Sequence, residues 1–146
     1  MASFTTQKIS FCGKTSLNIV TSDFKIDLLN SLQHKYNISI GDKSHQLLNN
    51  YNIRNIEKRH HVISLKTYGS SYFLYLTHIN GINYCFYIDR RVKQGYSTPR
   101  IISVKYRFSD RIFQDTLFTG DMVRDNQERW LYLIDNILVF FRRKTS

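Results

Sequence analysis

The sequence has few of the residues that cross-link, kink or anchor a chain. Its 146 residues include one proline and two cysteines, Cys12 and Cys85, which lack the paired spacing of a zinc site. A chain of this length can bury a core without a disulfide or a metal. Spanning a bilayer takes a run of about eighteen apolar residues, and the sequence has no apolar run near that length. The first residues also lack the apolar segment of a signal peptide. These absences predict a soluble, intracellular protein with no membrane partner and no structural metal.

Acidic residues are also scarce. The chain has 11 Asp and Glu against 21 Lys and Arg, which gives a net charge of +10 and a pI near 9.8. A surface this basic favours polyanions such as nucleic acid, nucleotides or an acidic membrane face. The alternative is that the charge serves solubility alone.

The sequence pattern changes along the chain from mixed to strongly β-forming. Short strands are predicted at 8–13 and 15–20, a helix over Ser22–Tyr36 with Ser22 as its N-cap, and a second helix over Asp42–Ile53. From residue 61 onward, runs of β-branched and aromatic residues alternate with turn signals, beginning with a strand over 61–66. Hairpins are predicted at Asn80-Gly81 and in the segment 124–129. The sequence therefore predicts one α+β domain over 1–146, whose C-terminal two-thirds forms an antiparallel sheet of about five or six strands.

Lys66 ends the first of these β-forming runs and is followed by the turn residue Gly69. A sheet delivers side chains into a cleft at such a strand end, and a lysine that is desolvated there can act as a nucleophile. The alternative is an ordinary surface charge at the end of a strand.

Three further stretches place polar groups in β-forming runs. Arg90 and Arg91 end one strand, and alternation allows at most one of them to face a pocket and hold a phosphate. Gly120 permits close approach of a ligand or of backbone, so that Asp121 could bind a ribose hydroxyl or a metal; the alternative is a bulge or turn. Asp135 and Asn136 interrupt the last apolar run, where local hydrogen bonding at a bulge is the alternative to a site.

The order of these features resembles a known family. Four motifs in a fixed order resemble those of the nucleotidyltransferase domain of mRNA capping enzymes. They are Lys-x-x-Gly at Lys66, Ile-Asp-Arg ending at Arg90, Thr-Leu-x-x-Gly-acid-x-Val over 116–123, and Tyr-Leu-Ile-x-x-Ile-Leu from Tyr132. These guanylyltransferases are related to ATP-dependent ligases, and compact viral and metazoan-type members look nearest. The resemblance covers 39–146 as a partial domain, most clearly from 39 to 140, and leaves 1–38 without a clear match. It implies an ATP-grasp/ligase-like sheet, incomplete at its C-terminal end, and a location in the nucleus, cytoplasm, viral factory or virion.

The resemblance also implies roles for individual residues. In this family the lysine at the position of Lys66 attacks the α-phosphate of GTP, carries GMP as a phosphoramidate and passes it to the diphosphate end of RNA. Gly69 falls on the glycine of the same motif, and Arg90 on an arginine near the phosphates. Gly120 and Asp121 fall on the Gly-Glu pair that reaches the ribose. GTP is thus the expected ligand, with Mg²⁺ or Mn²⁺ required only if the chain is active.

Several motif positions differ from the family pattern. The family has aspartate where this chain has Tyr68, and arginine where it has Ser71. Its Asp-Gly-Glu corresponds here to Thr119-Gly120-Asp121, in which the carboxylate is one methylene shorter. Its stacking aromatic and the aspartate after it correspond to Asp135 and Asn136. The later metal- and phosphate-binding motifs and the OB-fold lid are not found before Ser146.

These similarities and differences leave three hypotheses. The first is a guanylyltransferase-like pseudoenzyme that binds a nucleotide, a 5′ cap or an RNA 5′ end. The second is an active GTP:RNA guanylyltransferase, with a lysyl-GMP intermediate, that another chain completes. The third is a non-catalytic interaction subunit of a capping or transcription complex. A partner chain or a homo-oligomer is expected under the last two, because the final strand would present an exposed edge.

Overall fold

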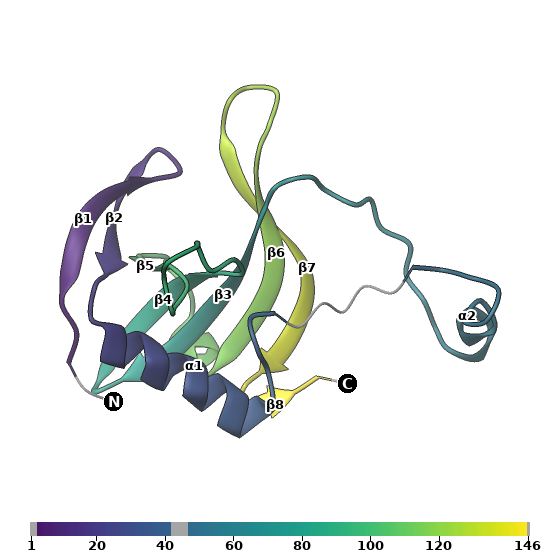
Figure 1. The fold of residues 1–146 in the computed structure, drawn as a ribbon, viewed down its shortest axis with the longest axis horizontal. Helices are drawn as coiled ribbons and strands as arrows, with labels where there is room; N and C mark the ends of the chain where they lie inside the picture. Colours follow the sequence, from purple (N-terminus) through teal and green to yellow (C-terminus); the bar gives the residue numbers. More distant parts are fainter. Residues whose placement is uncertain (1–2, 42–46, 146) are drawn as a thin grey trace.

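The computed structural model describes residues 3–41 and 47–145. Within these residues, eight strands form one sheet in the order β1-β2-β5-β4-β3-β6-β7-β8, and every neighbouring pair is antiparallel. Helix α1 packs on one face of the curved sheet (Figure 1). The strands are β1 Thr6–Phe11, β2 Lys14–Ile19, β3 Ser70–Ile79, β4 Ile82–Asp89, β5 Ile101–Val104, β6 Thr116–Arg124, β7 Trp130–Phe140 and β8 Arg143–Lys144. The helices are α1 Ser22–Tyr36, α2 Arg54–Lys58 and the 3-10 helix η1 Asp110–Phe113.

This architecture confirms the α+β class and the antiparallel sheet. The C-terminal two-thirds contributes six strands, β3 to β8, which agrees with the predicted five or six. The N-terminal hairpin β1–β2 joins the same sheet through β5. The two-residue turn Asn80-Gly81 has φ angles of 49° and 82°, as a type I′ hairpin requires. The hairpin between β6 and β7 is also confirmed, and its loop is closed by the carboxylate of Asp125, which accepts the backbone N–H groups of Gln127 and Arg129.

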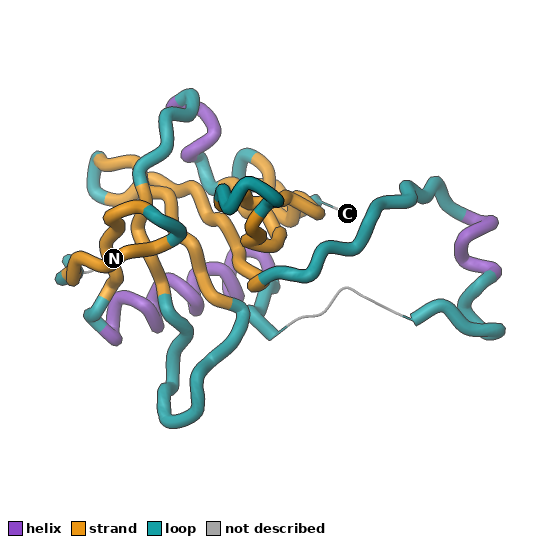
Figure 2. The backbone as a smooth tube through the Cα atoms, turned by 90° about the horizontal axis from the view of Figure 1, so that it is seen from above, coloured by secondary structure: helices purple, strands orange, loops and turns teal. Residues whose placement is uncertain are grey.

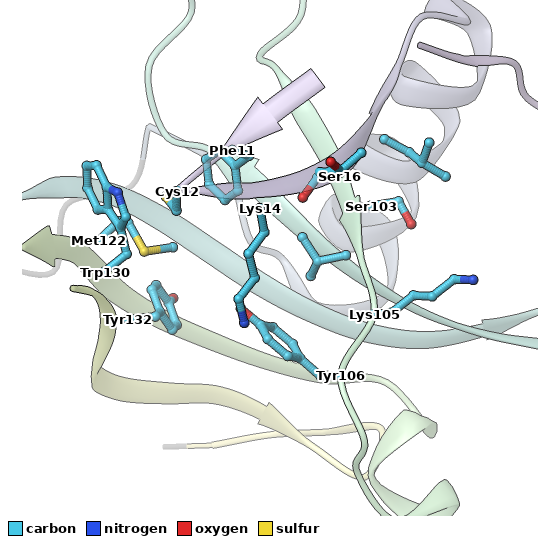
Figure 3. Close-up of a pocket in the computed structure, with 13 residues that line it drawn as sticks. Phe11, Cys12, Lys14, Ser16, Ser103, Lys105, Tyr106, Met122, Trp130 and Tyr132 are labelled. Carbon is cyan, nitrogen blue, oxygen red and sulfur yellow. The ribbon is translucent and has the colours of Figure 1, made fainter. Parts of the chain in front are cut away.

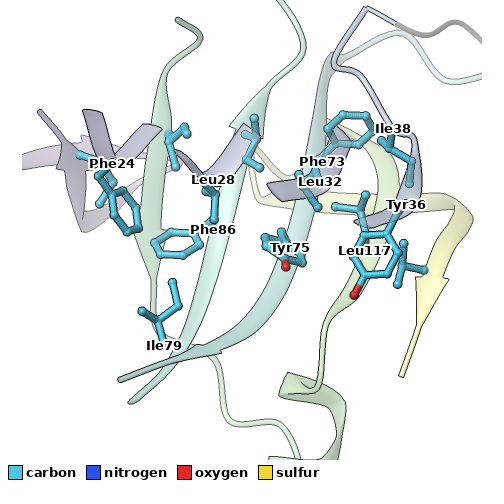
Figure 4. Packing of buried hydrophobic residues seen from close by; sticks show 14 residues of the cluster. Phe24, Leu28, Leu32, Tyr36, Ile38, Phe73, Tyr75, Ile79, Phe86 and Leu117 are labelled. Carbon is cyan, nitrogen blue, oxygen red and sulfur yellow. The ribbon is translucent and has the colours of Figure 1, made fainter. Parts of the chain in front are cut away.

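Helix α1 has the predicted limits but not the predicted cap. Phe24, Leu28, Leu32 and Tyr36 recur every four residues and are buried against the sheet (Figure 4). The N-cap is Thr21, whose hydroxyl oxygen accepts the backbone N–H of Thr5 at 2.8 Å and so ties the chain start to the helix. The prediction of Ser22 as N-cap is therefore wrong by one residue.

The face of the sheet under α1 forms an aromatic core. Phe73 and Tyr75 of β3 and Phe86 of β4 pack with the buried face of α1, and the rings of Phe24 and Phe86 lie 5.9 Å apart, edge to face (Figure 4). Each such ring contributes about 1.5–3 kcal/mol when it leaves water. The helix is therefore held by burial rather than by capping.

One buried carboxylate fixes the C-terminal end of α1 to the sheet. Asp115, 7% exposed, accepts the hydroxyls of Tyr36 at 2.6 Å, Tyr75 at 2.8 Å and Thr77 at 2.6 Å. The Lys35 ammonium lies 3.6 Å away. Burial would raise the pKa of Asp115, but the hydroxyl donors and the nearby ammonium outweigh it and hold the pKa below its usual value. Asp115 is thus ionised and saturated within the core.

The segment between α1 and β3 corrects two predictions. Residues 61–66 form no strand, and Val62, Ile63 and Leu65 are 93%, 100% and 95% exposed. The segment, with α2, projects away from the sheet (Figure 2), so no described strand pairs with it despite its β-forming composition. Of the helix expected over Asp42–Ile53, residues 42–46 lie outside the described part, residues 47–53 are not helical, and α2 begins only at Arg54.

The described part of the chain contains no helix of the length and apolarity needed to cross a membrane.

Candidate functional site

The carboxylate of Asp121 organises a polar cluster at one end of β6. Asp121 lies opposite Ser71 of β3 in the strand register. One carboxylate oxygen accepts the Ser71 hydroxyl at 2.8 Å, and the other accepts the Thr67 hydroxyl at 2.7 Å. A carboxylate offers about four acceptor positions, so this half-buried group keeps capacity for a further donor. We call Thr67, Ser71 and Asp121 the Asp121 cluster.

Lys66 lies next to this cluster but not in it. Its side chain is exposed, and its ammonium is 6.0 Å from the centre of the Tyr68 ring, which is also exposed. The hydrogen bond from the Thr67 hydroxyl to Asp121 attaches Thr67, the neighbour of Lys66 in sequence, to β6. Lys66 therefore lies on an irregular segment at the margin of the cluster, and the strand end expected for it is absent.

Gly69 and Gly120 both allow backbone to approach closely. A Cβ on Gly69 would overlap the carbonyl oxygen of Met122 and lie 2.6 Å from Cγ1 of Val123, because the chain crosses β6 there. A Cβ on Gly120 would overlap the carbonyl oxygen of Leu133 on β7. Gly120 thus allows close approach of backbone next to the register shift between Thr119 and Gly120, which is the bulge considered as its alternative role, and Gly69 allows the segment before β3 to approach β6.

Arg90 lies on the same side of the sheet as the Asp121 cluster. Its guanidinium is 4.7 Å from the centre of the Phe73 ring, and its Nε donates to the carbonyl of Ile40 at 3.3 Å. Its backbone N–H donates to the carbonyl of Ser71 at 3.3 Å. The half-buried cation thus sits between the end of α1 and the start of β3, whereas Arg91 is exposed.

Thr119, Asp135 and Asn136 mark an irregular part of the β6–β7 pairing. The register shifts between Thr119 and Gly120, and the buried Thr119 hydroxyl donates to the carboxylate of Asp135. The Asn136 side-chain oxygen accepts the N–H of Ile137 at 2.8 Å. Because Thr119 pairs with Phe73 and Asp121 pairs with Ser71, these polar groups share the α1 face of the sheet.

The fold therefore brings Ser71, Arg90, Thr119, Asp121 and Asp135 to one edge of the α1 face, while Lys66 and Tyr68 remain outside. Comparison with known protein families shows what the sequence is similar to. The family model described as mRNA capping enzyme, catalytic domain, matches residues 21–144. The chain belongs to this family.

No curated protein matches the sequence. The capping-enzyme match begins at residue 21, so it takes in α1 as well as every motif position described above. The Asp121 cluster, Arg90 and Lys66 all lie in the part of the chain that carries the family pattern.

A metal site would need several ligand side chains close together. Among residues 3–41 and 47–145, no group of three or more His, Cys, Asp or Glu side chains is placed to hold an ion. Mg²⁺ commonly reaches nucleotide sites through substrate phosphates with one or two carboxylates.

A second feature of the domain lies on the opposite face and was not predicted. A cavity of about 410 Å³ opens between the β1–β2 hairpin and the start of β7 (Figure 3). Lys14, Tyr106, Trp130 and Tyr132 are among its lining residues. Burial raises the pKa of Tyr106 and of Tyr132, so both phenols are neutral at physiological pH. These residues are far apart in sequence, so only the strand order could have revealed the cavity.

Proposed function

We propose that this guanylyltransferase-like domain binds a guanine nucleotide, as GTP or as the 5′ end of RNA, and does not complete nucleotidyl transfer with its own described residues. Family membership supports the guanylyltransferase-like character. The observation that carries the binding role is the Asp121 cluster beside Arg90, at the margin of which Lys66 lies.

Binding would use the two charges of this edge. The Asp121 carboxylate has acceptor capacity beyond the Thr67 and Ser71 hydroxyls, which suits a ribose hydroxyl. The Arg90 guanidinium supplies positive charge on the same face, which suits a phosphate. These roles agree with those that the family resemblance implies for the two positions.

The surroundings of Lys66 argue against efficient transfer. Nucleotidyl transfer depends on positioned groups that stabilise developing charge on the phosphates. Lys66 is exposed on an irregular segment, and its nearest ring is the exposed Tyr68, where the family pattern has aspartate. Ser71 stands where the family pattern has an arginine, and its hydroxyl donates a hydrogen bond to Asp121. The chain therefore has the lysine of the family's nucleophile position at Lys66, but it has the uncharged Tyr68 and Ser71 where the family has aspartate and arginine.

One observation favours an active enzyme as the alternative. Thr67, the residue after Lys66, donates its hydroxyl to the carboxylate of Asp121 at 2.7 Å. This hydrogen bond keeps Lys66 near the proposed nucleotide site. In that reaction the deprotonated Nζ of Lys66 attacks the α-phosphorus of GTP. An N–P bond forms, the bond from the α-phosphorus to the bridging oxygen breaks, and pyrophosphate leaves. A second chain would then supply the missing charge stabilisation.

A further observation favours an interaction subunit. Between Trp130 and Asn136, no described strand pairs with the outer edge of β7, because β8 reaches only its C-terminal end. Leu131, Leu133 and Ile134 are exposed on this strand. An apolar, unpaired edge suits strand addition by a partner chain or a second copy.

Labelled GTP distinguishes these functions. The protein is incubated with α-labelled GTP and Mg²⁺ or Mn²⁺, and both reversible retention and an acid-labile, alkali-stable adduct are measured. The proposal predicts saturable retention without the adduct. An adduct that disappears in Lys66→Ala and persists in the matched control Lys58→Ala would establish the active alternative. Absence of both retention and adduct would leave the interaction subunit.

A further inference from the structure

The cavity on the face opposite α1 has the chemistry of a nucleic-acid site. It is separate from the Asp121 cluster, because alternation along β6 turns Met122 into the cavity and Asp121 to the other face. Its volume of about 410 Å³ lies within the range of ligand sites. Figure 3 shows Lys14 extending into it toward Tyr106, with Trp130 and Tyr132 on the far side.

The charge of this cavity is positive and not neutralised. Lys14 and Lys105 line it, and neither lies within 4.0 Å of a carboxylate of the described residues. No Asp or Glu occurs among the described residues that form its wall. Arg100, whose guanidinium is 5.8 Å from the centre of the Phe11 ring, extends the positive charge along the β1 side.

The aromatic side of the cavity offers an open ring. Trp130 is 41% exposed, and the β1–β2 turn approaches it so closely that a Cβ on Gly13 would lie 3.8 Å from its Cδ1. The guanidinium of Arg124 on β6 lies 5.1 Å from the centre of the Trp130 ring and is paired with the carboxylate of Glu128 at 2.8 Å, so the uncompensated charge near the ring comes from the lysines of the cavity. Proteins bind single-stranded nucleic acid by combining a partly exposed aromatic ring, which stacks on a base, with nearby lysines, which attract phosphates, and Trp130, Lys14 and Lys105 line this one cavity.

We propose that this cavity binds single-stranded RNA, with a base stacked on Trp130 and a neighbouring phosphate on Lys14. A strand rather than a free nucleotide suits the site, since Lys105 also lines the cavity and Arg100 lies beside its lining residue Phe11, so that positive charge is present beyond Lys14. The inference does not depend on the proposed nucleotide site, which lies on the other face.

Fluorescence of the full chain tests this site, because Trp130 is its single tryptophan. A single-stranded RNA of about 10 nucleotides with a 5′-hydroxyl end is titrated against the protein, and binding is measured by tryptophan quenching and by anisotropy of a 3′ dye. Saturable quenching is expected. Trp130→Ala is expected to weaken anisotropy-detected binding about 5-fold to 100-fold, whereas Trp130→Phe keeps a stacking ring and most of the affinity.

Lys14 supplies the second, independent variant. Lys14→Ala is expected to lower the slope of log K against log salt by about 0.7, the loss of one phosphate contact. Its matched control is Lys8→Ala, which removes the same charge from an exposed position on the other face of the same hairpin. That control is expected to leave the slope nearly unchanged.

Three outcomes would overturn the inference. They are RNA binding without tryptophan quenching, equal effects of Lys14→Ala and Lys8→Ala, and equally tight binding of GMP, which would assign the cavity to free nucleotides. GTP retention is measured on the same protein. A domain that retains GTP but not RNA would therefore contradict this inference alone, and the reverse would contradict only the proposed function.

Discussion

Asp115 and Asp121 stand near the two ends of β6 on the same face of the sheet, and both accept hydroxyl groups from β3 or its approach. Asp115 is buried under α1, where three hydroxyls donate to it and the Lys35 ammonium lies 3.6 Å away. Asp121 is half-buried beyond α1 and has two hydroxyl donors. The two aspartates thus differ in burial and in the number of hydroxyl donors, and we propose that this difference leaves only Asp121 able to bind a ligand.

The largest expected effect comes from Asp115→Asn. Asparagine keeps the size and tolerates the φ angle of 51° at this position, but it loses the charge that three hydroxyls share. We expect a loss of about 3 kcal/mol in the free energy of unfolding, since hydrogen bonds to a charged group contribute about 1.5–3 kcal/mol each and are partly kept. Urea denaturation measures it, with the exposed Asp27→Asn of α1 as control. A loss equal to that of the control would contradict the structural role.

Gly120→Ala is expected to have the next largest effect. The added Cβ would overlap the Leu133 carbonyl and lie 2.9 Å from Cζ of Tyr132, so β7 must move away from β6. Overpacking of this kind costs about 1–3 kcal/mol. Gly41→Ala, where nothing lies within 4 Å of the new Cβ, is the matched control in the same thermal or urea assay. Equal stability of the two variants would mean that the close approach at β7 is not required.

Lowering the pH is expected to have a smaller effect on stability, which tests whether Asp115 is ionised in the folded protein. The folded pKa of Asp115 lies below its ordinary value of 3.8, so its ionised form stabilises the fold above that pH. This contribution is lost as the pH falls through the folded pKa. We therefore expect the stability difference between wild type and Asp115→Asn to be constant from pH 7 to about 5 and to shrink below about 4. A difference that stays constant to pH 3 would show that the carboxylate charge contributes nothing.

Local patterns predicted those parts of the fold that depend on neighbours in sequence. The spacing of Phe24, Leu28 and Leu32 gave the limits of α1, and Asn80-Gly81 gave the hairpin between β3 and β4. The run 61–66 has strand composition, but a strand also needs a partner edge, and none lies beside it in the described structure. Composition carries no information about that partner.

The residues of the candidate site were named from the order of the motifs along the chain. Lys66, Arg90 and Asp121 were found by their order along the chain, but the contacts of Asp121 with Thr67 and Ser71 appear only when β3 and β6 pair. No motif or spacing in the sequence predicts the contacts of Asp115 or the cavity beside Trp130. Each joins side chains from elements that the strand order, not the sequence distance, brings together.

Equilibrium retention of GTP by Asp121→Asn tests the central claim most directly. The exchange removes one charge from a half-buried group with two hydroxyl donors, so we expect at most about 1 kcal/mol of lost stability. The account predicts at least about tenfold weaker GTP binding by Asp121→Asn, the equivalent of about 1.4 kcal/mol, with wild-type affinity in Asp27→Asn. Unchanged GTP affinity in the folded Asp121→Asn variant would contradict it.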